Sequence, residues 1–185
     1  MSEFKKLTIS SITAILIFAG CERMKPDVSQ VPSYAEIDTL LTSQFDLLYK
    51  KSLIKEVWLD GQSESQDLEM DSLGWRAELS FLKEINPNQP EYVGAFDKEE
   101  SKNIIVLVLG EKESGSLSTF SFSREKGDIT SIEATIHEDK DVYVHHRDIS
   151  LTLTGGRIRE YQIDGYQKIM LKDTIRFRIR GSVVN

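Results

Sequence analysis

The chain has little cysteine and little histidine. Cys21 is the only cysteine among 185 residues, and the only histidines are His137, His145 and His146. A single cysteine excludes a disulfide within the chain and a metal site built from several thiolates. His145 and His146 are adjacent on an expected strand, so they face opposite sides and at most one can join His137. No His-Glu-x-x-His spacing is present. We therefore predict no metal site and no other cofactor.

Basic residues are in the minority. The chain carries 23 Lys and Arg against 30 Asp and Glu, a formal charge of −7 at pH 7. Nucleic acids bind to clustered Lys and Arg that neutralise phosphates, so we do not expect a nucleic acid as a partner. The 39% of hydrophobic and 29% of charged residues are typical of a folded chain. The length suits one domain.

A hydrophobic run long enough to span a bilayer is also missing from the N-terminus. The mostly apolar segment Leu7 to Phe18 follows Lys5 and Lys6 and ends in small residues. A transmembrane helix needs about 20 apolar residues. A positive start, a short apolar middle and a small-residue end are typical of a secretory signal peptide, which is removed. We predict such a signal over residues 1–20.

The end of this segment, residues 17–21, indicates which type of signal peptide it is. Ile17-Phe18-Ala19-Gly20-Cys21 resembles a bacterial lipobox, although Phe18 stands where Leu is usual. The resemblance implies that Cys21 becomes the first residue and carries diacylglycerol and a further acyl chain. Two or more acyl chains anchor a protein stably to a membrane. The alternative is an ordinary signal with a chance cysteine, so the prediction of lipidation rests on Cys21.

The residues after Cys21 indicate where the anchored domain lies. Residues 21–32 have no apolar period and are predicted to be a flexible tether. Glu22 is followed by Arg23 and Met24, not by the acidic cluster that directs some lipoproteins to the cell exterior. We therefore predict the cell envelope, and within it the outer membrane facing the periplasm.

Residues 33–185 are predicted to form a single domain that begins with two helices. Ser33 and Glu36 have the spacing of a capping box, and a helical apolar stripe follows. The stripe consists of Tyr34, Ile37, Leu41, Phe45 and Leu48. Ser72 is expected to cap a second helix, which Asn86-Pro87 ends.

Beyond the helices the apolar period changes to two, which is typical of strands. Tyr92 to Phe96 is expected to be one strand, and the apolar run Ile104 to Leu109 to be a central strand buried on both faces. Short turns between strands imply antiparallel pairing. The predicted fold class is α+β, with two N-terminal helices packed on one face of a twisted antiparallel β-sheet of roughly eight strands.

Arg176, Arg178 and Arg180 alternate with apolar residues on the last predicted strand. Three guanidinium groups on one face are a candidate contact for a phosphate or carboxylate. The other interpretation, which we favour, is cross-strand pairing with Asp and Glu on neighbouring strands. Both interpretations place the three arginines on the sheet face opposite the helices.

The sequence contains no strong catalytic motif. It has no Gly-x-Ser-x-Gly elbow and no Gly-rich phosphate loop before a helix. The sequence does not decide whether two carboxylates are paired for glycoside cleavage, because the fold sets the distance between them. We therefore predict that the chain is not an enzyme.

Two segments are similar to a large group of uncharacterised lipoproteins from Bacteroidetes-type bacteria. They are Trp75-Arg76-Ala77-Glu78-Leu79-Ser80-Phe81, which closes with Glu84-Ile85-Asn86-Pro87, and Tyr161-Gln162-Ile163-Asp164-Gly165-Tyr166-Gln167-Lys168. Glu84 stands where the group usually has Asp. The resemblance implies a helix-plus-antiparallel-sheet domain behind a lipobox signal, and it implies no activity.

These features favour a membrane-anchored envelope lipoprotein that binds an envelope protein partner or acts as a structural accessory. The first alternative is a carrier of a lipid or another hydrophobic ligand, which would need a second apolar surface. The Ser, Thr and Arg residues on the opposite face of most strands disfavour a carrier. The second alternative is an envelope hydrolase. The identity of any small-molecule ligand stays open.

Overall fold

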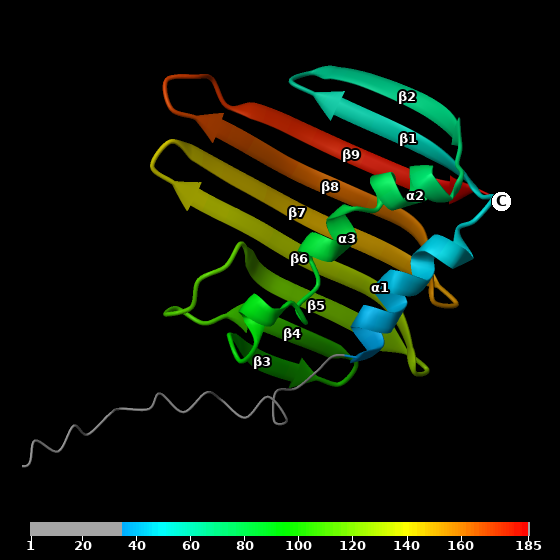
Figure 1. Cartoon of the computed structure of the whole chain (residues 1–185), viewed down its shortest axis with the longest axis horizontal. Helices are drawn as coiled ribbons and strands as arrows, with labels where there is room; N and C mark the ends of the chain where they lie inside the picture. Colours follow the sequence, from blue (N-terminus) through cyan, green and yellow to red (C-terminus); the bar gives the residue numbers. More distant parts are fainter. Residues whose placement is uncertain (1–34, 185) are drawn as a thin grey trace, which may run out of the picture. The chain divides into compact units, whose positions relative to one another are not determined.

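The computed structural model describes residues 35–184, which form three short helices and nine strands (Figure 1). The predicted signal peptide, Cys21, the tether and the Ser33 cap lie outside the described residues. The helices are α1 (Ala35–Leu47), α2 (Ser72–Glu78) and α3 (Phe81–Glu84). The strands are β1 (Ser52–Leu59), β2 (Gln62–Glu69), β3 (Phe96–Ser101), β4 (Ile104–Leu109), β5 (Leu117–Glu125), β6 (Asp128–Lys140), β7 (Tyr143–Thr154), β8 (Arg157–Ile169) and β9 (Ile175–Val184).

All nine strands form one antiparallel sheet in the order β2-β1-β9-β8-β7-β6-β5-β4-β3. Strands β3 to β9 follow one another as a meander, and the N-terminal hairpin β1–β2 lies beside the C-terminal strand β9 (Figure 1). The α+β class and the antiparallel pairing are therefore confirmed. The sheet has nine strands, not roughly eight.

Tight turns with two residues of positive φ close several of the hairpins. They are Asp60-Gly61, Lys126-Gly127 and Gly155-Gly156. Two consecutive positive φ values match the twist of the strands on either side, and glycine adopts them without a steric cost. These dipeptides fix the registers of β1–β2, β5–β6 and β7–β8.

The core lies between the helices and one face of the sheet, here called the helix face. From α1 and the residue after it, Ile37, Leu41 and Leu48 are buried there, as the predicted stripe requires. From the sheet, the largest buried side chains are Phe120, Phe122 and Tyr161. Figure 1 shows the helices crossing this face. The other face of the sheet carries no helix among the described residues.

The predicted second helix is two helices in the structure. Asp71, not Ser72, caps α2, because its carboxylate accepts a 2.7 Å hydrogen bond from the Gly74 amide. A continuous helix would turn Phe81 about 200° away from Leu79. The break at residues 79–80 instead lets both side chains be buried, and the Phe81 ring lies 5.4 Å from that of Tyr161.

Two strand predictions were wrong. Residues Pro90–Tyr92 form a 3₁₀ turn, and Tyr92 is buried there because its hydroxyl accepts a 3.0 Å hydrogen bond from the Leu117 amide. The apolar strand β4 is next to the sheet edge, and Ile104 and Val108 are largely exposed on the face away from the helices. The unbroken apolar run of β4 therefore belongs to a strand that is covered on one face only.

Polar contacts fix the helices on the sheet. The buried Gln44 of α1 donates to the Leu40 and Gly156 carbonyls and accepts from the Ile158 amide at 2.8–2.9 Å. These bonds join α1 to the start of β8. On α2, Glu78 pairs with Lys55 at 2.8 Å and accepts a hydrogen bond from the Tyr161 hydroxyl. Burial, and then this hydrogen bond, raise the pKa of Tyr161, which keeps its hydroxyl protonated.

Candidate functional site: a groove on the open face

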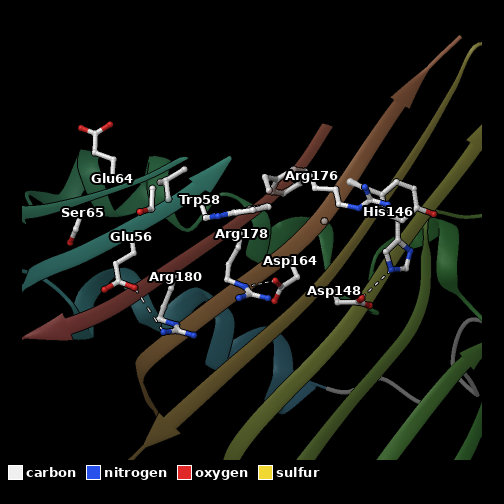
Figure 2. A pocket seen from close by; sticks show the side chains of 15 residues that line it. Glu56, Trp58, Glu64, Ser65, His146, Asp148, Asp164, Arg176, Arg178 and Arg180 are labelled. Carbon is white, nitrogen blue, oxygen red and sulfur yellow. Dashed lines mark hydrogen bonds and ion pairs between the residues drawn. The ribbon is translucent and has the colours of Figure 1, made fainter. Parts of the chain in front are cut away.

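A groove of about 1030 Å³ lies on the sheet face opposite the helices (Figure 2). Side chains from the five neighbouring strands β2, β1, β9, β8 and β7 line most of it. The lining includes Glu56, Trp58, Ser63, Ser65, His146, Asp148, Asp164, Tyr166, Arg176, Arg178 and Arg180. We call this surface the groove face.

The strand registers assemble the groove from distant parts of the sequence. Trp58 pairs with Arg178, which pairs with Asp164, which in turn pairs with Asp148. A parallel row places Arg176 beside Tyr166 and Tyr166 beside His146. Because successive side chains of a strand alternate between its faces, every member of these two rows points away from the helices.

The three arginines identified in the sequence lie together, but their partners differ. Arg178 Nε donates to Asp164 at 2.5 Å. Arg180 donates to the Gln162 amide oxygen at 2.9 and 3.2 Å, and its guanidinium lies 3.9 Å from Glu56. Within residues 35–184, no carboxylate lies at ion-pair distance from the Arg176 guanidinium. Cross-strand pairing therefore accounts for Arg178 and, more weakly, for Arg180.

The adjacent histidines face opposite sides of β7, as their spacing predicts. His146 is on the groove face, where its ring stacks on Tyr166 with centroids 5.3 Å apart, and His137 lies edge-on to it at 5.8 Å. His145 is on the helix face near Phe177. Burial, and then the nearby Arg147 charge, lower the pKa of His145. Across residues 35–184, no group of three His, Cys, Asp or Glu side chains is placed to hold a metal ion.

A short hydrogen-bonded chain connects three groove-face side chains. Asp148 accepts from Thr135 Oγ1 at 2.9 Å, and its other carboxylate oxygen lies 3.0 Å from His146 Nε2. In a catalytic triad the imidazole lies between the hydroxyl and the carboxylate, so that it can take the hydroxyl proton. Here the carboxylate is in the middle, and the imidazole does not contact the Thr135 hydroxyl. This order orients His146 but gives the Thr135 hydroxyl no imidazole base.

Two smaller hollows continue the groove along the same face. One of about 340 Å³ shares Glu56 and Arg180 with it, and one of about 460 Å³ shares Asp148 and Asp164. The second hollow reaches β4 through Val106. Together the three form a trough across most of the sheet, which suits an extended ligand better than a compact one.

Sequence reasoning singled out the arginines but not Trp58 or Tyr166. The available signal was alternation, because Trp58 lies between Val57 and Leu59 in the sequence and successive side chains of a strand point to opposite faces. Joining Trp58 to the arginine strand requires the β1–β9 pairing, whose partners lie about 120 residues apart. No local pattern specifies that pairing.

The described helices include none long and apolar enough to cross a membrane. Comparison with models of protein families gives no match, and comparisons with curated proteins and with solved structures give none either.

Proposed function

We propose that this chain is a lipid-anchored, non-enzymatic binding protein of the bacterial envelope, held at the outer membrane by Cys21 and facing the periplasm. Its groove face binds the ligand or partner, and its helices cover the other face for stability. The observation that carries the binding role is the groove of about 1030 Å³ with an exposed tryptophan and three arginines. A concave surface that combines an exposed aromatic side chain with several charged side chains is typical of a ligand-binding site.

Support for the anchor is the lipobox-like segment that ends in Cys21, together with a signal-like charge and hydropathy pattern before it. A lipid at Cys21 fixes the domain to a surface through a tether of about a dozen residues. Confinement of this kind raises the effective concentration of the domain near envelope ligands.

A hydrophobic carrier is less well supported. Such a carrier needs an apolar hollow, and the space between helices and sheet is filled by side chains such as Trp75, Phe81 and Phe120. The groove on the other face is lined mostly by charged and hydroxyl-bearing residues. A hydrolase is also less well supported, because the Thr135–Asp148–His146 order differs from that of a catalytic triad and leaves the hydroxyl without an imidazole base.

The anchor can be tested by labelling cells with a radioactive or alkyne-bearing palmitate and separating the envelope membranes. We expect label on the wild-type chain in the outer-membrane fraction, and none on a Cys21→Ser variant. An unlabelled wild-type chain, or a mature N-terminus at any residue other than Cys21, would contradict the proposal.

The binding role needs a separate test in the same cells. Replacing Trp58 and Arg176 together by Ala and Gln should abolish the chain's contribution to any envelope phenotype of the deletion strain, while the label and the membrane fraction stay unchanged. A double variant that complements as well as the wild type would show that the groove is not used.

A further inference from the structure

Arg176 is the cation of the groove best placed to meet a ligand. Its neighbours Arg178 and Arg180 each have an acceptor on an adjacent strand, whereas the Arg176 guanidinium has no carboxylate partner among the described residues. A guanidinium presents two parallel N–H groups that match a carboxylate. Its cross-strand neighbour Tyr166 is held flat by stacking on His146. A cation free of an ion pair therefore lies beside a fixed aromatic ring.

Trp58 provides a second aromatic surface in the same groove. Trp58 is 39% exposed on β1 and lines the groove. Figure 2 shows Trp58 and Arg178 on neighbouring strands, with Arg176 further along β9. The faces of aromatic rings are electron-rich and attract polarised C–H groups, which the faces of sugar rings present in a row.

The remaining groove side chains suit hydroxyl groups. Ser63, Ser65 and Glu56 offer hydroxyl and carboxylate oxygens on the β1–β2 side. Asp148 and Asp164 offer carboxylate oxygens on the β7–β8 side. These acceptors oppose a ligand that is negatively charged along its whole length, so the ligand should carry isolated acids among neutral units. The length of the trough, with its two further hollows, fits several such units.

We infer that the groove binds a sparsely acidic oligosaccharide, with sugar rings on Trp58 and Tyr166 and a uronate carboxylate on Arg176. This inference rests on the proposed binding role of the groove and names the ligand class for it. A lipid chain would leave the charged side chains of the groove without polar partners, and a densely charged polyanion would meet the repulsion of Glu56, Glu64 and Asp148.

The test is calorimetric titration of the full-length protein, purified in detergent, with two probes that differ in one acid. The first probe is xylotetraose that carries a single glucuronic acid branch, and the second is xylotetraose that carries a single glucose branch at the same position. The variants are Arg176→Gln and, as a matched control outside the lining of the groove and its two hollows, Arg157→Gln on β8. Urea unfolding of each variant verifies that the fold is intact.

We expect the acidic probe to bind the wild type at least about tenfold more tightly than the neutral one, because a charged hydrogen-bonded pair is formed only by the acid. Arg176→Gln should remove this difference and leave the weak binding of the neutral probe unchanged. Arg157→Gln should leave both affinities as they are.

Three other outcomes would overturn the inference, and they differ in what they leave of the proposed function. Equal affinity for both probes with no effect of Arg176→Gln would leave a sugar-binding groove without acid recognition. Binding of neither probe, with Trp58-dependent binding of a peptide library or of anionic vesicles, would leave the binding role with another ligand class. Binding of none of these would reject the binding role as well.

Discussion

The two faces of this sheet are built from the same strands but have opposite compositions. Along β8, Tyr161 and Ile163 are buried on the helix face, while the alternate residues Gln162 and Asp164 point into the trough on the other side. Strand alternation thus gives each strand a stabilising side and a side free for recognition. Substitutions on the helix face should therefore change the stability of the fold, and substitutions on the groove face should change ligand binding, with little overlap between the two effects.

The largest expected effect is on the helix face. Phe120→Ala removes a fully buried aromatic ring and leaves a cavity, so the free energy of unfolding should fall by about 3–5 kcal/mol. Its neighbour Ser121 lies on the groove face, and Ser121→Ala should change stability by no more than about 0.5 kcal/mol. Urea denaturation followed by circular dichroism measures both. Equal losses of unfolding free energy in the two variants would contradict the assignment of stability to the helix face.

A smaller loss is expected from Gly181→Ala on β9. A Cβ at this position would lie 2.1 Å from the Tyr161 ring, which is itself held by the bond of its hydroxyl to Glu78. The ring or the strand must move, which should cost about 1–3 kcal/mol of unfolding free energy. The adjacent Ser182→Ala on the groove face is the matched control and should be nearly neutral. A Gly181→Ala protein as stable as the wild type would show that Tyr161 is not fixed.

On the groove face, Arg178→Gln should have little effect on stability. Arg178 is exposed and Asp164 is partly exposed, and ion pairs at the surface contribute about 0–1 kcal/mol. The variant should nevertheless weaken binding of the acidic xylo-oligosaccharide, because it removes positive charge from the row beside Trp58. A loss of more than about 2 kcal/mol of unfolding free energy, with unchanged binding, would show that Arg178 stabilises the fold and does not bind the ligand.

The smallest predicted effect is pH dependent and belongs to the helix face. Burial lowers the pKa of His145 in the folded state, so the unfolded chain binds a proton more readily. The free energy of unfolding should therefore fall as the pH is lowered through about 6.5, the ordinary pKa of histidine, towards the folded value. In a His145→Gln variant this part of the pH dependence should disappear. Identical slopes for the variant and the wild type in urea titrations between pH 5 and 7 would contradict it.

Local patterns predicted much of the helix face. The antiparallel pairing and the opposite orientation of His145 and His146 follow from a period of two and are present. Of the predicted α1 stripe, Ile37, Leu41 and Leu48 are buried, whereas Tyr34 lies outside the described residues. Strand β3 was missed because its sequence, Phe96-Asp97-Lys98-Glu99-Glu100-Ser101, lies at the sheet edge, where neither face needs apolar residues. The broken second helix was missed because tertiary packing of Phe81, not a local signal, sets the break.

The groove face was harder to predict, for a different physical reason. Its arginines were visible as an alternating row, but a trough depends on which strands lie side by side. The β1–β9 pairing brings Trp58 to the arginine strand, and the register of β7 with β8 brings His146 to Tyr166. The β1–β9 pairing is a non-local contact that no periodic pattern specifies, whereas the β7–β8 register follows from the Gly155-Gly156 hairpin. The anchor at Cys21 stays a prediction from the sequence.

The chain's two tryptophans provide the most direct test of the division between the faces, since Trp58 lies in the groove and Trp75 is buried under the helices. Fluorescence of the single-tryptophan variants Trp75→Phe and Trp58→Phe would be recorded while the acidic xylo-oligosaccharide or a fatty acid is added. We predict that the oligosaccharide shifts the emission of Trp58 and leaves that of Trp75 unchanged. A ligand that shifts Trp75 and not Trp58 would place the binding site between helices and sheet, and it would contradict the account.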